Sequence, residues 1–207
     1  TGDFTVIQTG ALNLGSLNMS GGNLTIVADS NITINSLTGT IGAISITSKT
    51  GNIKILNNTA EAAAVALNAA SGSIAVAMIE ADTLDITAGS SVSIVEKDDV
   101  VVNSLNLNIG FAYVDLRAGG NITLNDDLSV TNSASITLYA GNDGSGSLTV
   151  NKALTTASGA ITLTAGSGMT LSEQADLTTT SGDVILNAGT GALTMTGETV
   201  INAGSGL

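Results

Sequence analysis

The chain contains no cysteine, no histidine and no proline, and its 207 residues include only two Phe, two Tyr and no Trp. The lack of cysteine excludes disulfides, thiolate metal sites and cysteine nucleophiles. The lack of histidine removes the commonest general base and transition-metal ligand. The absence of proline is expected where nearly every backbone N–H donates to a neighbouring strand.

Basic residues are also scarce, with five Lys and Arg against 17 Asp and Glu and a net charge of −12. A surface of this sign repels nucleic acid and anionic membranes. No apolar run approaches the roughly 20 residues of a membrane-spanning helix. We therefore expect no nucleic-acid partner and no membrane insertion.

Aliphatic residues are abundant, and they recur in a repeat. Residues 158–204 contain one unit twice, first as SGAITLTAGSGMTLSEQADLTTT and then as SGDVILNAGTGALTMTGETVINAG. Ile161 and Leu163 of the first unit correspond to Val184 and Leu186 of the second. A period of about 20 to 25 residues with apolar-polar alternation inside each piece is typical of a solenoid.

The same period runs through the whole chain. Short apolar-polar-apolar segments place two side chains inward and one outward, and three such segments make one turn. The first segments of successive turns begin near residues 4, 24, 44, 65, 84, 114, 136, 161 and 184. An antiparallel sandwich or barrel also has many short strands, but a near-constant three-strand repeat favours parallel stacking. We predict an all-β, right-handed parallel β-helix of about nine coils.

We expect residues 1–207 to form a single, uncapped solenoid domain with two irregularities. Excursions are expected near 56–64 and 105–112, where the spacing of the repeat changes. The segment TAEAAA at 59–64 is the one candidate for a helical turn.

The segment VDLRAGGNITL at 114–124 carries a family resemblance. It resembles the Leu-x-Leu-x-Ala-Gly-x-Ile-x-Leu repeats of filamentous-haemagglutinin-like bacterial surface proteins, and most other turns match more loosely. The resemblance covers essentially the whole chain. It implies a right-handed parallel β-helix in a large secreted or cell-surface protein that acts as an adhesin or structural fibre.

Stacking the first segments predicts one acidic cluster. Asp85 and Asp115 would be outward neighbours one turn apart, with Arg117 beside them. Two carboxylates roughly 5 Å apart are suited to glycoside cleavage, but they are equally suited to sharing the arginine as an ion pair. Because the chain lacks histidine and an aromatic sugar platform, we predict no enzyme and no catalytic residue. Together with Phe111 and Tyr113, these residues form the predicted interaction surface.

Calcium is the one cofactor with candidate ligands. Asp126, Asp127 and Asp143 lie in turns that could offer oxygen ligands, but their spacing matches neither the EF-hand loop nor the calcium-roll repeat. Solvated turn residues are the simpler interpretation, and we expect no cofactor.

The predicted function is a non-enzymatic structural or adhesive segment of a bacterial extracellular or cell-surface fibre. One alternative is a self-assembling filament subunit that stacks end to end; another is a polysaccharide-binding or -cleaving β-helix. The expected partners are further copies or flanking repeats, and a glycan or protein of a host or neighbouring cell. End-to-end stacking would involve the apolar residues of the first and last turns: Phe4, Val6, Leu193, Met195, Val200 and Ile201.

Overall fold

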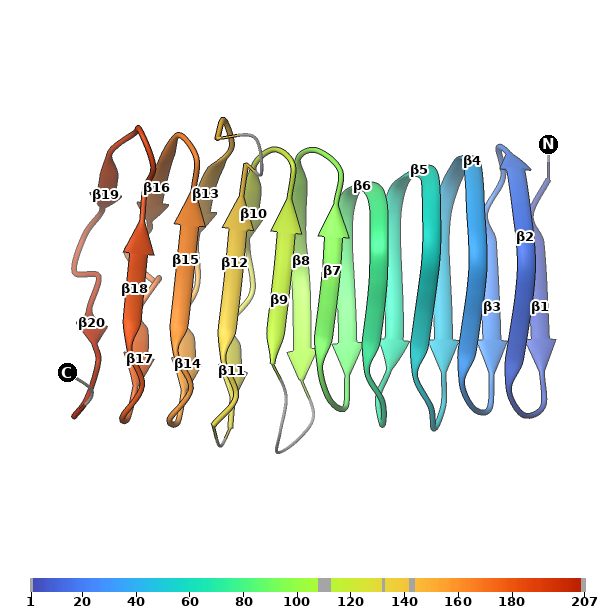
Figure 1. Ribbon diagram of the computed structural model, residues 1–207, viewed down its shortest axis with the longest axis horizontal. Helices are drawn as coiled ribbons and strands as arrows, with labels where there is room; N and C mark the ends of the chain where they lie inside the picture. The colour runs from blue at the N-terminus through green and yellow to red at the C-terminus, as the bar shows by residue number, and fades with distance from the viewer. Residues whose placement is uncertain (1, 108–112, 132, 142–143, 206–207) are drawn as a thin grey trace.

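The computed structural model describes residues 2–107, 113–131, 133–141 and 144–205, and within these ranges the chain is all-β with no helix. Parallel strands stack as a β-solenoid of about nine turns, which confirms the predicted fold class. The result is a rod with the two termini at opposite ends (Figure 1). Within the described ranges there is accordingly no helix of the length and apolarity that a membrane span requires.

One ladder of strands, which we name face A, runs along the entire rod. Each strand pairs in parallel with its equivalent one turn earlier and one turn later. The strands of face A are β2 (Leu12–Ser20), the first parts of β4 (Ile32–Ser48), β5 (Ile53–Ala69) and β6 (Ile74–Ala88), and then β7 (Val92–Glu96), β9 (Val114–Ala118), β12 (Ile136–Ala140), β15 (Ile161–Ala165) and β18 (Val184–Asn187).

The other side of the rod differs between its two halves. In the N-terminal half, face B consists of β1 (Phe4–Gln8), β3 (Leu24–Ala28) and the last parts of β4, β5 and β6. Face B pairs onward with β8 (Val100–Leu107). Two ladders follow β8: face C, with β10 (Ile122–Leu124), β13 (Ser147–Val150), β16 (Gly168–Leu171) and β19 (Leu193–Met195), and a four-stranded sheet of β11 (Leu128–Val130), β14 (Leu154–Thr156), β17 (Leu177–Thr179) and β20 (Ile201–Asn202).

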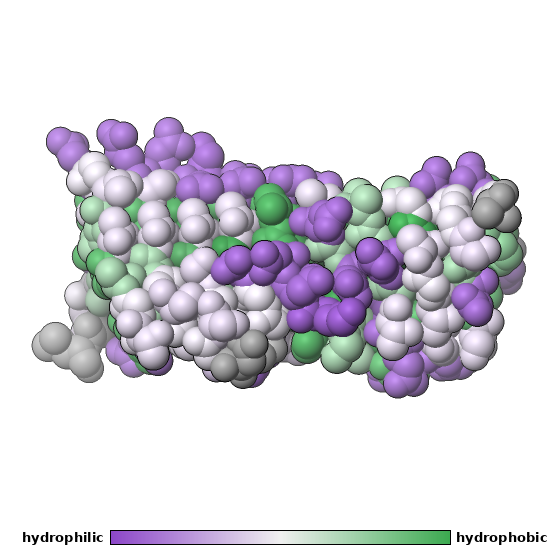
Figure 2. Space-filling view, turned by 90° about the horizontal axis from the view of Figure 1, so that it is seen from above, coloured by the Kyte–Doolittle hydropathy of each residue, from purple (hydrophilic) through white to green (hydrophobic). Residues whose placement is uncertain are grey.

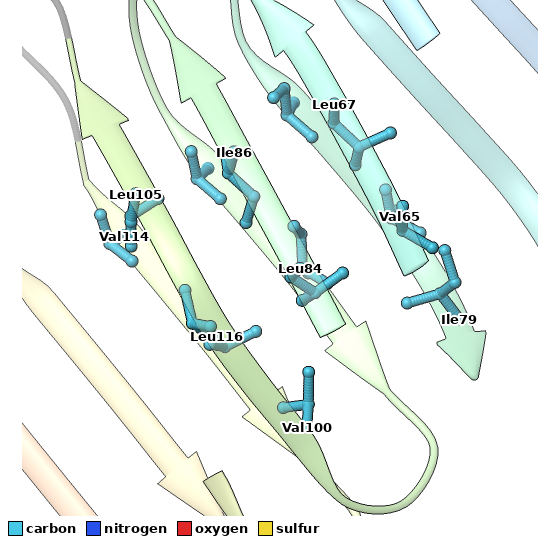
Figure 3. Packing of buried hydrophobic residues seen from close by; sticks show 14 of the residues in the cluster. Val65, Leu67, Ile79, Leu84, Ile86, Val100, Leu105, Val114 and Leu116 are labelled. Carbon is cyan, nitrogen blue, oxygen red and sulfur yellow. The ribbon is translucent and has the colours of Figure 1, made fainter. Parts of the chain in front are cut away.

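The core consists of columns of aliphatic side chains that stack from turn to turn. Val65 pairs with Leu84, and Leu67 with Ile86, and all four are buried. Figure 3 shows these side chains in successive layers inside the coil. Burying one such side chain stabilises the fold by about 1.5–3 kcal/mol before the entropy of ordering is subtracted. Continuous columns therefore supply the cohesion that an aromatic core gives other proteins.

Polar side chains tie the turns together at the start of the strands. The Asn52 N–H donates to Asn31 Oδ1 at 2.8 Å, and the Ser73 N–H donates to Asn52 Oδ1 at 2.7 Å. The Ser147 N–H likewise donates to Asn121 Oδ1 at 2.8 Å. The Asn or Asp that precedes a strand therefore supplies an acceptor to the next turn, in addition to its turn-forming role.

The predicted helical turn at 59–64 is wrong, and of the predicted excursion near 56–64 the structure shows a register shift against β6, between Ile55 and Glu61, inside a continuous strand. These residues lie inside β5, and their ladder with β4 runs without a shift from Leu37–Asn58 to Ala43–Ala64. Ala60 and Ala62 are buried at the corner between faces A and B. Pairing with β4 and burial in the coil override the helix propensity of alanine. Of the second predicted excursion, residues 105–107 belong to β8, and 108–112 lie outside the described residues.

The predicted stacking of first strands is confirmed within two blocks and is wrong between them. The strands beginning near 4, 24, 44, 65 and 84 stack on face B, and those near 114, 136, 161 and 184 stack on face A. Leu84 pairs with Val102, whereas Val114 pairs with Val92. The predicted alignment therefore passes from face B to face A between Leu84 and Val114, because this stretch holds more than one full turn.

We name residues 77–107 the joint. Here β6 pairs with both β7 and β8, and each of the two ladders contains one register shift, between Val76 and Ile79 and between Leu84 and Asp85 respectively. The joint separates a long-strand region, where β4, β5 and β6 have 17, 17 and 15 residues, from a short-strand region with strands of two to five residues.

Candidate binding surface

The predicted neighbourhood of Asp85 and Asp115 is wrong. Asp85 lies on face B and pairs with Ser104, whose Oγ donates to Asp85 Oδ1 at 2.7 Å. Asp115 lies on face A and pairs with Ser93 and Thr137. The two carboxylates belong to different ladders and lie on different sides of the rod, so they cannot act on one glycosidic bond as acid and nucleophile.

Face A brings together a second set of residues, which we name the tyrosine–arginine patch: Tyr113, Asp115, Arg117 and Tyr139. Asp115 and Arg117 point outward from β9, and Arg117 pairs in register with Tyr139 of β12. Tyr113, immediately before β9, is 51% exposed. The patch thus collects the chain's single Arg and both of its Tyr. Tyr and Arg are the residue types most enriched among energetically important contacts at protein interfaces.

An ion pair orders the patch. Arg117 Nε donates to Asp115 Oδ1 at 2.9 Å. This hydrogen bond, reinforced by the charge of Asp115, raises the pKa of Arg117 above its ordinary value. The sequence predicted Tyr113, Asp115 and Arg117 as part of an interaction surface but missed Tyr139. Of the other two predicted members, Asp85 lies on face B, and Phe111 lies outside the described residues.

A shallow groove continues the patch along face A toward the N-terminus. Its volume is about 180 Å³. Val95 at its edge pairs directly with Arg117, and Leu56 in the groove is 38% exposed. The groove is lined by Lys54, Ile55, Leu56, Ala75, Val76, Ala77, Ser93 and Val95.

Lys54 gives this groove a free cation. Lys49, Lys97 and Arg117 are held by ion pairs, and Lys152 donates to Gln174. Across the described ranges, the Lys54 ammonium has neither an ion pair nor a hydrogen bond. The groove, the Lys54 ammonium and the tyrosine–arginine patch form one continuous surface along face A, which we name the strip. Its length suits contact with an extended partner.

The calcium candidates have other partners. Asp126 Oδ2 accepts the Leu105 N–H at 3.0 Å, and its Oδ1 accepts the Asp127 N–H at 3.0 Å. Asp127 Oδ1 accepts the Ala153 N–H at 3.0 Å. Asp143 lies outside the described residues. No cluster of three or more acidic side chains with metal-binding geometry occurs in the part of the chain that the structure describes.

A second groove, about 420 Å³ in volume, runs along the N-terminal half of the rod from Gly21 to Asp98 in the joint. Its walls combine small residues with carboxylates, and Lys97 forms an ion pair with one of them, Glu80. Figure 2 shows hydrophilic side chains gathered about midway along the rod. We name this second groove the acidic groove; its lining residues are Gly21, Gly22, Thr40, Ile41, Gly42, Glu61, Ala62, Ala63, Glu80, Ala81, Asp82 and Asp98.

Glu96, at the end of β7, is 1% exposed and lies behind this groove. Burial, with a smaller contribution from the negative charge of Asp98, raises the pKa of Glu96 to about 7, although hydrogen bonds from backbone N–H groups oppose the shift. Sequence reasoning missed this residue. Its signal was present, because VSIVE carries Glu at the third inward position, where VDLRA and ITLYA carry Ala.

The two ends of the described rod expose apolar side chains. Phe4 is 38% exposed in the first turn, and Val6 is partly buried. In the last turn the exposed fractions are 43% for Leu193, 43% for Met195, 52% for Val200 and 39% for Ile201. The outer edges of these turns offer both apolar surface and backbone groups for a further coil.

Comparison with known proteins gives no match to the chain among family models, curated proteins or solved structures. The parallel β-solenoid is compatible with a β-helix repeat protein.

Proposed function

We propose that this chain is a non-enzymatic structural and adhesive segment of a bacterial extracellular or cell-surface fibre, similar in role to filamentous-haemagglutinin-like proteins. The observation that carries the proposal is the unbroken face A ladder from β2 to β18. Parallel strands bonded from turn to turn, over continuous aliphatic columns, make a stiff spacer that holds a contact surface away from its anchor. The ladder is the structural half of the role.

The adhesive half is assigned to the strip on face A. Tyr113 and Tyr139 offer flat rings, Asp115 and Arg117 offer a paired donor and acceptor, and Lys54 offers a free charge. Such a combination suits a glycan or a protein on a host or neighbouring cell, because aromatic rings pack on apolar faces while the polar groups fix orientation. Each turn adds about 4.8 Å along the rod, so contacts can repeat along an extended partner.

Adhesion under flow tests this proposal. The chain is displayed on bacterial cells without adhesins of their own, and retention is measured on epithelial layers and on immobilised oligosaccharides. We expect the double variant Tyr113→Ala, Arg117→Ala to reduce retention at least about tenfold, as loss of central interface residues does. Asn13→Ala, outward on face A but away from the patch, is the matched control. Retention no better than that of undisplayed cells would contradict the adhesive role.

A second candidate function is end-to-end assembly into a filament. It is favoured by the exposed apolar side chains of the last turn, among them Met195 and Val200, and by Phe4 in the first turn. Light scattering and electron microscopy of the purified chain distinguish it from the first candidate. Fibres that lose length with Met195→Asp support assembly, whereas a monomeric rod at high concentration contradicts it.

A further inference from the structure

Glu96 occupies an apolar position at the centre of the joint. In the inward column it stands between Ile79 of the preceding turn and Ala118 of the following turn. Both neighbours are buried, as is Glu96 itself. A carboxyl group in such a column has no structural use unless its oxygens satisfy other groups, because an unsatisfied buried polar group is costly.

Its oxygens connect β6 to the turn that follows β7. Oε1 accepts the Ala81 N–H of β6 at 3.0 Å, and Oε2 accepts the Asp98 N–H at 2.7 Å. Ala81 lies in β6 between the two register shifts, and Asp98 lies in the turn between β7 and β8. The Glu96 side chain thus supplies acceptors in place of backbone carbonyls at the point where β6 shifts register against β7 and β8.

We propose that the joint is a pH-responsive hinge, closed when Glu96 is neutral and opened more often when Glu96 is ionised. The neutral carboxyl carries no buried charge and still offers an oxygen to each N–H group. These hydrogen bonds by themselves favour the ionised form, but the burial of the side chain outweighs them. The ionised form places a charge inside an aliphatic column, and opening the joint hydrates that charge. The rod would then yield at this point before it yields within either half.

The surrounding charges favour the same direction. Burial is the main cause of the raised pKa of Glu96, and Asp98 adds to it. Lys97, the nearest cation in sequence, points to Glu80 and forms an ion pair there. Arg117, on the following turn, is paired with Asp115 on the outward face. The other charged groups of the elements around Glu96 are carboxylates: Glu61 of β5, Glu80 and Asp82 of β6, and Asp98 and Asp99 after β7.

Amide hydrogen exchange tests the hinge. Opening constants are measured at pH 5.5 and pH 8.5 and corrected for the intrinsic exchange rates. An opening that restores the ordinary pKa of Glu96 should become about 30-fold more favourable at the higher pH. We expect the increase at Ala81 and across 97–107, with little change in β3 or β15. A uniform change along the rod, or none, would overturn the proposal.

Two variants assign the effect to Glu96. Glu96→Gln stays neutral at both pH values, so the pH dependence at the joint should disappear. Asp82→Asn removes a carboxylate of the acidic groove without touching the Glu96 contacts. This variant should keep the pH dependence of opening at the joint. If Glu96→Gln does not fold, carbon-13 titration of the five Glu carboxyls in the wild-type chain decides. One midpoint near 7, matching the exchange transition, supports the hinge; five midpoints near 4.5 overturn it.

Discussion

The two halves of the rod use the same alternation of apolar and polar residues but build different strands from it. In the long-strand region, β4, β5 and β6 pass from face A to face B without a break. In the short-strand region each turn is divided into three separate strands (Figure 1). The difference lies at the corners. Small or aliphatic residues such as Ile41 and Ala62 allow a strand to continue through the corner, whereas turn residues such as Gly120 and Asn125 end it.

Strand continuity should therefore determine how often each region opens, because the two regions have the same kind of aliphatic core. Longer strands hold more ladder hydrogen bonds per cooperative segment, so the long-strand region should open less often. The aliphatic columns on the two sides of the joint are equally buried. Perturbations matched across the joint can separate these two contributions.

The largest effect is expected from matched truncations in the core. Leu67→Ala lies in the long-strand region and Leu163→Ala in the short-strand region, and the exposed fractions of the two side chains are 1% and 0%. Each should lower the free energy of unfolding by about 2–5 kcal/mol through lost burial and a residual cavity. Urea denaturation gives the loss, and hydrogen exchange should show the larger opened segment for Leu163→Ala. Equal protection of both regions would show that strand length is irrelevant.

The joint itself should make stability depend on pH. The pKa of Glu96 rises from 4.5 to about 7 on folding, so between these values the folded chain binds more protons than the unfolded chain. The contribution is fully present below pH 4.5 and is lost as the pH rises through 7, and it amounts to roughly 3 kcal/mol. Urea unfolding from pH 4 to pH 8, compared with Glu96→Gln, isolates this term. A variant curve parallel to that of the wild type would refute it.

A smaller effect should distinguish a corner from an open turn. Gly39, inside β4, has φ +98°, and an added Cβ would lie 1.8 Å from the carbonyl oxygen of Met19. Gly10 has a similar φ of +94° with open space around it. Gly10→Ala should cost about 1 kcal/mol of unfolding free energy from backbone strain alone. Gly39→Ala should cost at least about 1 kcal/mol more, because the backbone of β2 must move. Equal shifts in Tm would show that the continuous corner tolerates displacement.

The sequence predicted the stacking within each half because the inward positions of the repeat are chemically uniform. The prediction failed where helix propensity competed with strand pairing. Ala60 and Ala62 favour a helix locally, but they lie in β5 and pair with β4. The prediction also failed at the joint, where LDITA, the last five residues of β6, is followed closely by VSIVE, the five residues of β7. The prediction assumed one first strand per turn and therefore aligned Leu84 with Val114. These residues lie on faces B and A, so the alignment wrongly placed Asp85 beside Asp115.

The candidate surface was predicted as far as one strand determines it. Residues 113, 115 and 117 share a face by alternation alone, so Tyr113, Asp115 and Arg117 could be grouped without a structure. Tyr139 depends on the register of the next turn, 22 residues later. Lys54 lies two turns before β7 on face A, and grouping it with the patch requires the true stacking order across the joint.

The joint has a consequence for where along the rod a partner binds. A rod built from identical turns is translationally degenerate, so a partner that contacts only the repeated Thr, Ser and Asn side chains can slide among equivalent sites. The register shifts of the joint break that symmetry; Glu96 lies within the joint, and the acidic groove and the strip on face A both reach it. A partner that binds at the joint therefore has a defined position along the rod, and its distance from either end is fixed.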